Sequence, residues 1–330
     1  MLFEAASGIK DLRQVSAAEL TDEAWRVRMS HFPPRLFASA PGAKRYRNAF
    51  YGNHPQHFVN LTVTGDACAL KCDHCQGKLL RSMVPVSDPA ELVSRAADLR
   101  RGGATGVLLS GGCSADGSVP LDEHLEAIAK VKEMGLTVLV HGGLLERETA
   151  RRLKDAGVDQ VLLDVIGDEA TIREVYHLDR RPDDYRRTLE ILREEGLDAV
   201  PHIVLGLHYG RLGGEYQALE MITAAQPAHI VLVLLQPLPG SPMEAMPVTA
   251  GVELGRLAAI ARLLNRTIPI SLGCARPAGE GKNDLEVSAV AAGVNGVAYP
   301  LEDTVRYARG RGLEVEFAEV CCSLLGAREA

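Results

Sequence analysis

The sequence predicts an α/β protein built as a (β/α)8 barrel of the TIM type. Three observations predict it. Eight short apolar runs alternate with stretches of helical period from about residue 57 onward. Strands separated by helices pair in parallel. The chain of 330 residues also has room for eight such units, which typically need about 250 residues.

The expected strands are the eight apolar runs, and four of the stretches between them have a clear helical period. The runs are Phe58–Val63, Gly106–Leu109, Thr137–Val140, Gln160–Asp164, Ala199–Leu205, Ile230–Leu235, Ile268–Leu272 and Gly296–Tyr299. The helical stretches are Leu92–Arg100, Leu125–Met134, Ala150–Ala156 and Leu254–Leu264. In such a barrel the active site lies in the loops that follow the strands.

Two flanking segments complete the predicted organisation. Residues 1–56 form an N-terminal extension that is polar and irregular apart from a predicted helix at 17–30. Residues 57–312 form the barrel. Residues 313–330 form a C-terminal tail whose alternating start predicts one more strand. We expect this tail to close the barrel mouth.

Composition narrows the function classes. The hydrophobic fraction of 46% and charged fraction of 24% are those of a globular protein. The formal net charge of -7 argues against a nucleic-acid partner. No apolar run reaches the roughly 18 residues that a membrane helix needs, and the first residues lack a signal-peptide pattern. We therefore expect a cytoplasmic protein without a membrane partner, whose seven cysteines serve metal binding or catalysis.

The strongest motif is a C-x3-C-x2-C cluster directly after the first barrel strand, made by Cys68, Cys72 and Cys75. Soft thiolate ligands select iron–sulfur clusters or zinc. A structural zinc site or a complete four-iron cluster takes four protein ligands, so three leave one position open. The motif favours an iron–sulfur cluster with one open iron. The alternative is half of a zinc site completed elsewhere in the chain.

This motif, at this place in a barrel, resembles that of the radical SAM superfamily. The resemblance implies a [4Fe-4S] cluster held by Cys68, Cys72 and Cys75, with S-adenosyl-L-methionine (SAM) chelating the fourth iron. It further implies that one-electron reduction cleaves the sulfonium and releases a 5′-deoxyadenosyl radical that abstracts a hydrogen atom. These three cysteines are therefore the predicted catalytic and metal-binding residues.

Further positions match the cofactor-binding residues of that superfamily. Ser110, Gly111 and Gly112 follow the second strand, where the family has a glycine-rich turn for the methionine amino group. His74 occupies the position of an aromatic residue whose backbone meets the adenine. A Ser-Gly-Gly sequence is also a common turn, so the turn alone does not identify a cofactor site.

Two charged residues are further candidates for binding SAM. Asp164 ends the fourth predicted strand and suits the ribose hydroxyls, because a carboxylate accepts two hydrogen bonds from a diol. Arg187 could pair with the cofactor carboxylate as a two-pronged donor. The alternatives are a helix cap for Asp164 and a solvated helix face for Arg187.

Within the superfamily, the segments Pro237–Met243 and Ser271–Arg276 resemble biotin synthase, and the resemblance covers the predicted barrel. It implies sulfur donation from a second cluster inside the barrel. The positions that should hold that cluster's three cysteines are here Leu108, Leu139 and about Val200. Apolar side chains cannot bind iron, so we expect the chain not to be a biotin synthase.

Four cysteines remain outside the motif, the number that a second iron–sulfur cluster would need. Cys113 follows the glycine-rich turn, Cys274 follows the seventh strand, and Cys321 and Cys322 lie on the tail. We expect them to converge at the barrel mouth as an auxiliary cluster, with one of the adjacent pair possibly spare. The alternative is that they are buried thiols acting as small hydrophobic side chains.

The segments Ser110–Cys113 and Pro201–His208, with the terminal cysteine pair, resemble one component of the two-protein lipoyl synthases of archaea and some bacteria. The resemblance implies a sulfurtransferase of lipoate biosynthesis. Its partners would be a second radical SAM protein and an octanoylated lipoyl domain or carrier protein. The cysteine triplet that precedes the motif in single-chain lipoyl synthases is absent. Three alternatives remain open: a single-cluster enzyme that catalyses a rearrangement or other hydrogen abstraction, a biotin synthase-related sulfurtransferase, and a zinc-stabilised binding protein.

Overall fold

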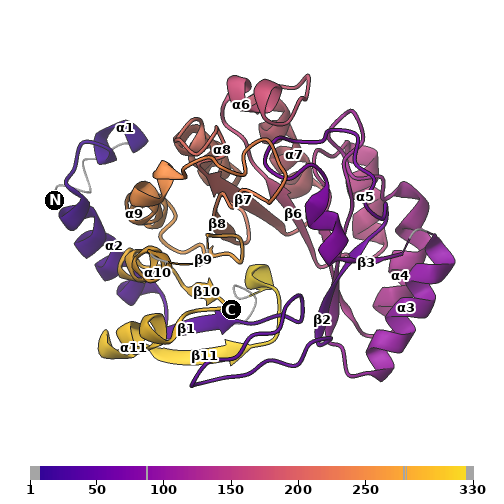
Figure 1. Ribbon diagram of the computed structural model, residues 1–330, viewed down its shortest axis with the longest axis horizontal. Helices are drawn as coiled ribbons and strands as arrows, with labels where there is room; N and C mark the ends of the chain where they lie inside the picture. Colours follow the sequence, from indigo (N-terminus) through magenta and orange to yellow (C-terminus); the bar gives the residue numbers. More distant parts are fainter. Residues whose placement is uncertain (1–7, 87, 278, 280, 325–330) are drawn as a thin grey trace.

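The computed structural model describes residues 8–324 except 87, 278 and 280, and it confirms a barrel-type α/β fold (Figure 1). Eleven parallel strands form one curled sheet in the order β11-β1-β10-β9-β8-β7-β6-β5-β4-β2-β3. All eight predicted apolar runs are strands of this sheet. They are β2 (Phe58–Thr62), β4 (Gly106–Ser110), β5 (Thr137–His141), β6 (Gln160–Asp164), β7 (Ala199–Leu205), β8 (Ile230–Leu234), β9 (Ile270–Leu272) and β10 (Gly296–Ala298).

Helices cover the outer face of the sheet (Figure 1). Local chemistry fixes where they begin; α3, for example, starts with a proline after Asp88, whose side chain accepts from the Glu91 amide. The helices that follow strands are α3 (Pro89–Arg101), α4 (Leu125–Glu133), α5 (Arg147–Asp155), α6 (Glu169–Glu174), α7 (Pro182–Glu194), α8 (Glu215–Ala225), α9 (Leu254–Leu264), α10 (Lys282–Ala291) and α11 (Glu302–Gly310). Three short 3-10 helices span Lys78–Ser82, Asp122–His124 and Thr249–Glu253.

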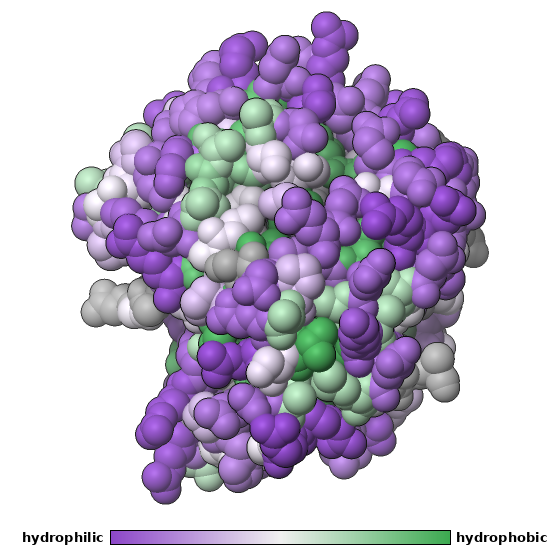
Figure 2. All heavy atoms as spheres, turned by 90° about the vertical axis from the view of Figure 1, so that its right-hand side faces the viewer, coloured by the Kyte–Doolittle hydropathy of each residue, from purple (hydrophilic) through white to green (hydrophobic). Residues whose placement is uncertain are grey.

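Hydrophilic residues cover most of the side that carries α3 and α4, with small hydrophobic areas between them (Figure 2). This agrees with amphipathic helices whose apolar faces pack on the sheet. None of the described helices is both long enough and apolar enough to cross a membrane.

The N-terminal extension contributes to the sheet, which the sequence analysis did not anticipate. Its helices are α1 (Ile9–Leu12) and α2 (Ala17–His31), the latter predicted and capped by Ser16. Its strand β1 (Arg35–Ser39) pairs with both β10 and β11. This strand is short and follows two prolines, so its pattern is weak. It pairs with strands on both sides, so a boundary at residue 56 cuts through the sheet.

The tail forms its predicted strand and then runs into the space that the curled sheet encloses. Strand β11 (Glu314–Ala318) pairs with β1 at one end of the sheet, and the two-residue strand β3 (Val84–Pro85) lies at the other. Beyond β11, the Ser39 hydroxyl donates to the Val320 carbonyl at 2.7 Å. The Gln160 amide donates to the Ser323 carbonyl at 3.3 Å. Because Gln160 is the first residue of β6, the tail reaches the far end of the interior.

A second apolar cluster fills this interior, separate from the core between sheet and helices. Its buried members are Ala40, Phe58, Leu139, Leu162, Val200, Val231, Val233, Ala298, Tyr299 and Cys322. Cys321 and Leu324 pack against it. The tail therefore supplies part of the barrel's own core, and closure of the mouth by the tail stays a prediction. Residues 325–330 lie outside the described residues.

Candidate functional site

The cysteine motif lies on a tightly folded loop between β2 and the first 3-10 helix. The Cys72 carbonyl accepts from the amides of Cys75 and Gln76 at 3.1 and 2.9 Å. Lys71 and Gln76 adopt positive φ angles of 48° and 53°. These local bonds hold the loop in a compact turn that places its three cysteines around one region. All three are free thiols, and Cys72 is buried.

Gly112 allows the loop after β4 to pack against the cysteine loop. A Cβ atom at Gly112 would lie 1.9 Å from the Ala67 carbonyl oxygen and 2.5 Å from the Cys68 Cβ. The Gly112 amide donates to the Thr64 hydroxyl at 2.7 Å. In the same contact, the Ala69 amide donates to the Cys113 carbonyl at 2.8 Å. The glycine-rich turn is therefore needed for the close approach of two loops, whatever else it binds.

Cys113 joins the motif cysteines. Burial, together with the neighbouring charges of Cys68, Asp164 and Cys75, raises the pKa of Cys113 to about 12. Burial likewise raises the pKa of Cys72 and of Cys75, with contributions from the other motif thiols. Deprotonating these thiols together is unfavourable, because their negative charges repel one another. A bound metal ion would reverse this, since it deprotonates its thiol ligands outright.

The thiol spacing fits a cluster better than a single ion. A tetrahedral zinc ion would hold its sulfur ligands about 3.8 Å apart. Among the described residues, Cys68, Cys72 and Cys75 are not a group whose ligand atoms all lie within 4.8 Å of one another. A four-iron cluster binds each thiolate at a different iron, so it spans a wider set of sulfurs. The spacing of the three cysteines therefore disfavours one tetrahedral zinc ion and is compatible with a larger cluster.

Asp164 lies beside the cysteine loop and is held as a carboxylate. Burial would raise its pKa, but the charges and hydrogen bonding of His141, His202 and His74 outweigh burial and lower the pKa to about 2. The Asp164 Oδ1 lies 3.7 Å from His141 Nε2. The Tyr176 hydroxyl is 3.5 Å from the other oxygen. Asp164 is not a helix N-cap; the cap of α6 is Asp168.

His74 and Ser110 lie in the same region. The His74 ring is 5.3 Å from the Tyr176 ring, and burial lowers the pKa of His74. Its Nδ1 atom is buried and has no hydrogen-bond partner among the described residues, which leaves it available to a ligand. The Ser110 hydroxyl, also buried, lies 3.5 Å from the His141 carbonyl.

Arg187 is exposed on α7, whose buried face is formed instead by residues such as Tyr185 and Thr188. It therefore lies on the solvated helix face that the sequence allowed as the alternative. Its pairing with the cofactor carboxylate stays a prediction from the sequence.

Three of the four remaining cysteines form a second group. Cys322 is buried in the interior cluster, Cys321 packs against it, and Cys274, an exposed residue that follows β9, lies near enough for desolvation and the charge of Cys321 to raise its pKa. A hydrogen bond between the neighbouring thiols lowers the pKa of Cys321 and raises that of Cys322. The expectation that Cys113 converges with them is wrong, because the loop after β4 holds it beside the first group.

The second group occupies the part of the barrel where Leu139 and Val200 lie. Leu139 and Val200 belong to the same interior cluster as Cys322, and Leu108 packs against that cluster. The tail thus brings thiols to positions where the strands themselves carry apolar side chains.

Lys44 is a site residue that sequence reasoning missed. Its Nζ lies 4.1 Å from the centre of the Tyr299 ring, and its charge lowers the pKa of Cys274. Burial lowers the pKa of Lys44 itself, while Cys274 opposes that shift. Because Lys44 lies in the irregular extension, no periodicity or spacing marks it.

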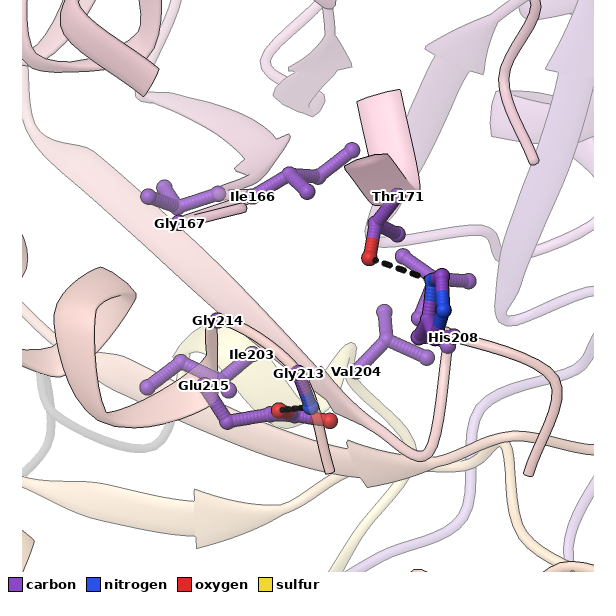
Figure 3. Close-up of a pocket in the computed structure, with 11 residues that line it drawn as sticks. Ile166, Gly167, Thr171, Ile203, Val204, His208, Gly213, Gly214 and Glu215 are labelled. Atoms are coloured by element: carbon purple, nitrogen blue, oxygen red, sulfur yellow. Dashed lines mark hydrogen bonds between the residues drawn. The ribbon is translucent and has the colours of Figure 1, made fainter. Parts of the chain in front are cut away.

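A small pocket lies beside the ends of β6 and β7, lined by residues of the loops that follow them (Figure 3). The Thr171 hydroxyl lies 3.2 Å from His208 Nδ1. The buried Glu215 accepts from the amides of Gly206 and Gly213 at 2.8 and 2.6 Å. These bonds hold the loop after β7 in place, and His208 contributes to them through its contact with Thr171.

Comparison with known proteins agrees with this geometry. Residues 62–211 match the family model of the radical SAM superfamily. The biotin synthase of Acidithiobacillus ferrooxidans is 26% identical over 258 residues, covering 76% of this chain and 80% of that protein. The structure of methylornithine synthase superposes with a TM-score of 0.64 at 17% identity, covering 96% of both chains. A maturase of the [FeFe]-hydrogenase gives a TM-score of 0.64 at 12% identity, covering 99% of this chain and 72% of that one.

Proposed function

We propose, from the premise that this chain carries a radical SAM domain and is related to the biotin synthases, that it inserts sulfur into an unactivated C–H bond. More specifically, we propose that it is one component of a two-protein lipoyl synthase. The observation that carries the proposal is the second thiol group, in which Cys322 is buried in the barrel interior, Cys321 packs against the interior cluster, and Cys274 lies near Cys321.

The first cysteine group is suited to hold a [4Fe-4S] cluster with one iron open to SAM. When bound, the cluster and SAM together supply one-electron cleavage of the sulfonium and hydrogen abstraction from carbon, and a second cluster supplies sulfide. The remaining contributions belong to the protein. Asp164 is ionised at neutral pH and can accept hydrogen bonds from two ribose hydroxyls. The orphaned His74 Nδ1 offers a further polar contact at the same place.

The second group is suited to hold the auxiliary cluster. Three thiols gather there from two elements, and Lys44 adds a positive charge that favours thiolates. Three cysteines again leave one position open for another ligand. His141 is one candidate, because its charge lowers the pKa of Cys321.

The His141–Asp164 pair joins the two groups. The charge of Asp164 acts on Cys75 and Cys113, while that of His141 acts on Cys321. The two residues are 3.7 Å apart. A substrate carbon placed at this pair would therefore face the open iron on one side and the tail cysteines on the other. The surrounding apolar interior would exclude water, which protects reactive intermediates.

A protein-bound octanoyl chain is a suitable substrate, because an extended apolar chain can lie against the apolar interior cluster without losing hydrogen bonds. Under this proposal a second radical SAM protein inserts the other sulfur atom. The alternative, a single-cluster enzyme that rearranges its substrate, has no use for the tail cysteines.

The test is isotopic. The iron-free protein is reconstituted anaerobically with iron and ³⁴S-sulfide, then incubated with SAM, a reductant and an octanoylated lipoyl domain. We expect the domain to gain one ³⁴S atom for each chain. In the variant with Cys274, Cys321 and Cys322 changed to alanine, 5′-deoxyadenosine should still form without sulfur transfer. If unchanged protein forms 5′-deoxyadenosine and no sulfur enters the domain, the lipoyl assignment is wrong.

A further inference from the structure

We propose that His54, His57 and Glu319 form a binding site for one divalent transition-metal ion, such as zinc, that fastens the C-terminal tail to the start of the first barrel strand. The site is separate from both cysteine groups. Its ligand atoms come from the loop just before β2 and from the residue just after β11, so residues far apart in the chain meet at one point.

The geometry is that of a compact ligand set. One nitrogen or oxygen from each of the three residues lies within 4.8 Å of the others. His54 Nδ1 is 2.9 Å from Glu319 Oε1, and His57 Nδ1 contacts Oε2. A tetrahedral zinc ion would hold such atoms about 3.4 Å apart, so small side-chain rotations suffice to admit it. The two imidazole rings lie stacked, with centroids 5.0 Å apart.

Glu319 supplies the observation that points to a ligand. Its side chain is only 10% exposed, whereas His54 is 74% exposed and His57 37%. The Oε1 atom accepts from the Tyr51 hydroxyl and the His54 amide at 2.8 and 2.9 Å. The Oε2 atom is buried and is contacted by His57 Nδ1, but it accepts no hydrogen bond of regular geometry among the described residues. A buried carboxylate oxygen and an imidazole nitrogen held together in this way could both bind one cation placed between them.

The donor set selects the class of metal. Two imidazoles with one carboxylate suit zinc and other borderline transition ions, and the exposed side of His54 leaves a fourth position for water. Tyr51 fixes the carboxylate through Oε1, as supporting residues commonly orient metal ligands. Magnesium and calcium prefer sites made of oxygen atoms and are disfavoured here.

The position of Glu319 gives the ion a structural consequence. Glu319 lies two residues before Cys321, and His57 immediately precedes β2, which leads to the motif cysteines. In Figure 1 the yellow segment after β11 turns toward the interior from this point. An ion here would hold the tail in the barrel. The benefit to sulfur insertion rests on the proposed function, whereas the metal site itself does not.

The test uses the iron-loaded protein dialysed against rising free Zn²⁺, with zinc and iron counted per chain. We expect unchanged protein to bind one more zinc than the double variant His54→Ala/His57→Ala. Glu319→Gln should weaken that zinc at least tenfold while keeping a hydrogen-bond acceptor for Tyr51. His31→Ala, which removes an exposed histidine on α2 outside the cluster, is the matched control and should keep the zinc.

A second measurement needs no variant. Hydrogen exchange of peptides covering 314–324 should slow when zinc is added to unchanged protein, and should not respond in His57→Ala. Equal zinc in unchanged protein and the double histidine variant would overturn the proposal, as would zinc lost only on Cys321→Ser. Zinc that binds without slowing exchange would refute the fastening role. Iron content, which reports the cysteine clusters, should be the same in all the histidine variants, so this outcome is independent of the proposed function.

Discussion

Gly112 offers the sharpest perturbation of the first cysteine group. In Gly112→Ala the new Cβ would lie 1.9 Å from the Ala67 carbonyl oxygen, whereas real contacts of this kind essentially never fall below 3.0 Å. The obstacle is backbone, so no side-chain rotation relieves it. The chain next to Cys68 must therefore move by at least about 1 Å, and overpacking of this kind costs about 1–3 kcal/mol.

Two glycines serve as graded controls. At Gly111 the nearest atom to a new Cβ is a methyl carbon of Thr64 at 3.0 Å, so a smaller adjustment suffices. At Gly310, which ends α11, nothing lies within 4 Å. Alanine there should be neutral or stabilising by about 0.5–1 kcal/mol, because alanine favours helix over glycine.

The assay is iron content after anaerobic reconstitution, together with the rate at which a chelator removes the iron and the free energy of unfolding in urea. We expect Gly112→Ala to fold and to lose cluster iron at least tenfold faster than unchanged protein, with Gly111→Ala between the two. If Gly112→Ala holds iron as firmly as Gly310→Ala, the loop contact does not position Cys68 and the reasoning fails.

Three further predictions concern charge. Asp164→Asn should weaken SAM binding about tenfold in calorimetry without changing iron content, since a charged acceptor is worth about 1.5–3 kcal/mol; unchanged affinity would remove Asp164 from the ribose site. Arg187→Ala should leave SAM affinity unchanged, and a tenfold loss would mean that this exposed residue reaches the cofactor after all. Burial lowers the pKa of His202 to about 4 and of His229 to about 3. Their stabilising contribution is therefore present above about pH 6.5 and lost as pH falls toward 4, by about 1.4 kcal/mol per pH unit for each. The free energy of unfolding of the iron-free protein is measured in urea at a series of pH values. It should fall less steeply with falling pH in His229→Gln than in unchanged protein, and an equal pH dependence would show that His229 titrates normally.

The strands were predictable because parallel strands buried on both faces carry continuous apolar runs, such as Ile230–Leu234. The cysteine motif was predictable because its ligands are close in sequence. Strand β1 was not, since its pairing partners β10 and β11 lie more than 250 residues away in the chain.

The grouping of the remaining cysteines was predicted only in part. Cys274 and the tail pair meet because β11 ends where the tail can turn inward, as the alternating start of the tail suggested. The placement of Cys113 depends on contact between the loops after β2 and β4. Such a contact, like the roles of Lys44 and Glu319, follows from tertiary packing and leaves no local pattern in the sequence.

Iron counting in three proteins tests the central claim most directly. The account predicts about eight irons per chain in unchanged protein after anaerobic reconstitution. About four should remain when Cys68, Cys72 and Cys75 are changed to alanine, and about four when Cys274, Cys321 and Cys322 are changed instead. Four irons in unchanged protein that persist without the tail cysteines would contradict two separate clusters, and zinc in place of iron at the first group would contradict the whole account.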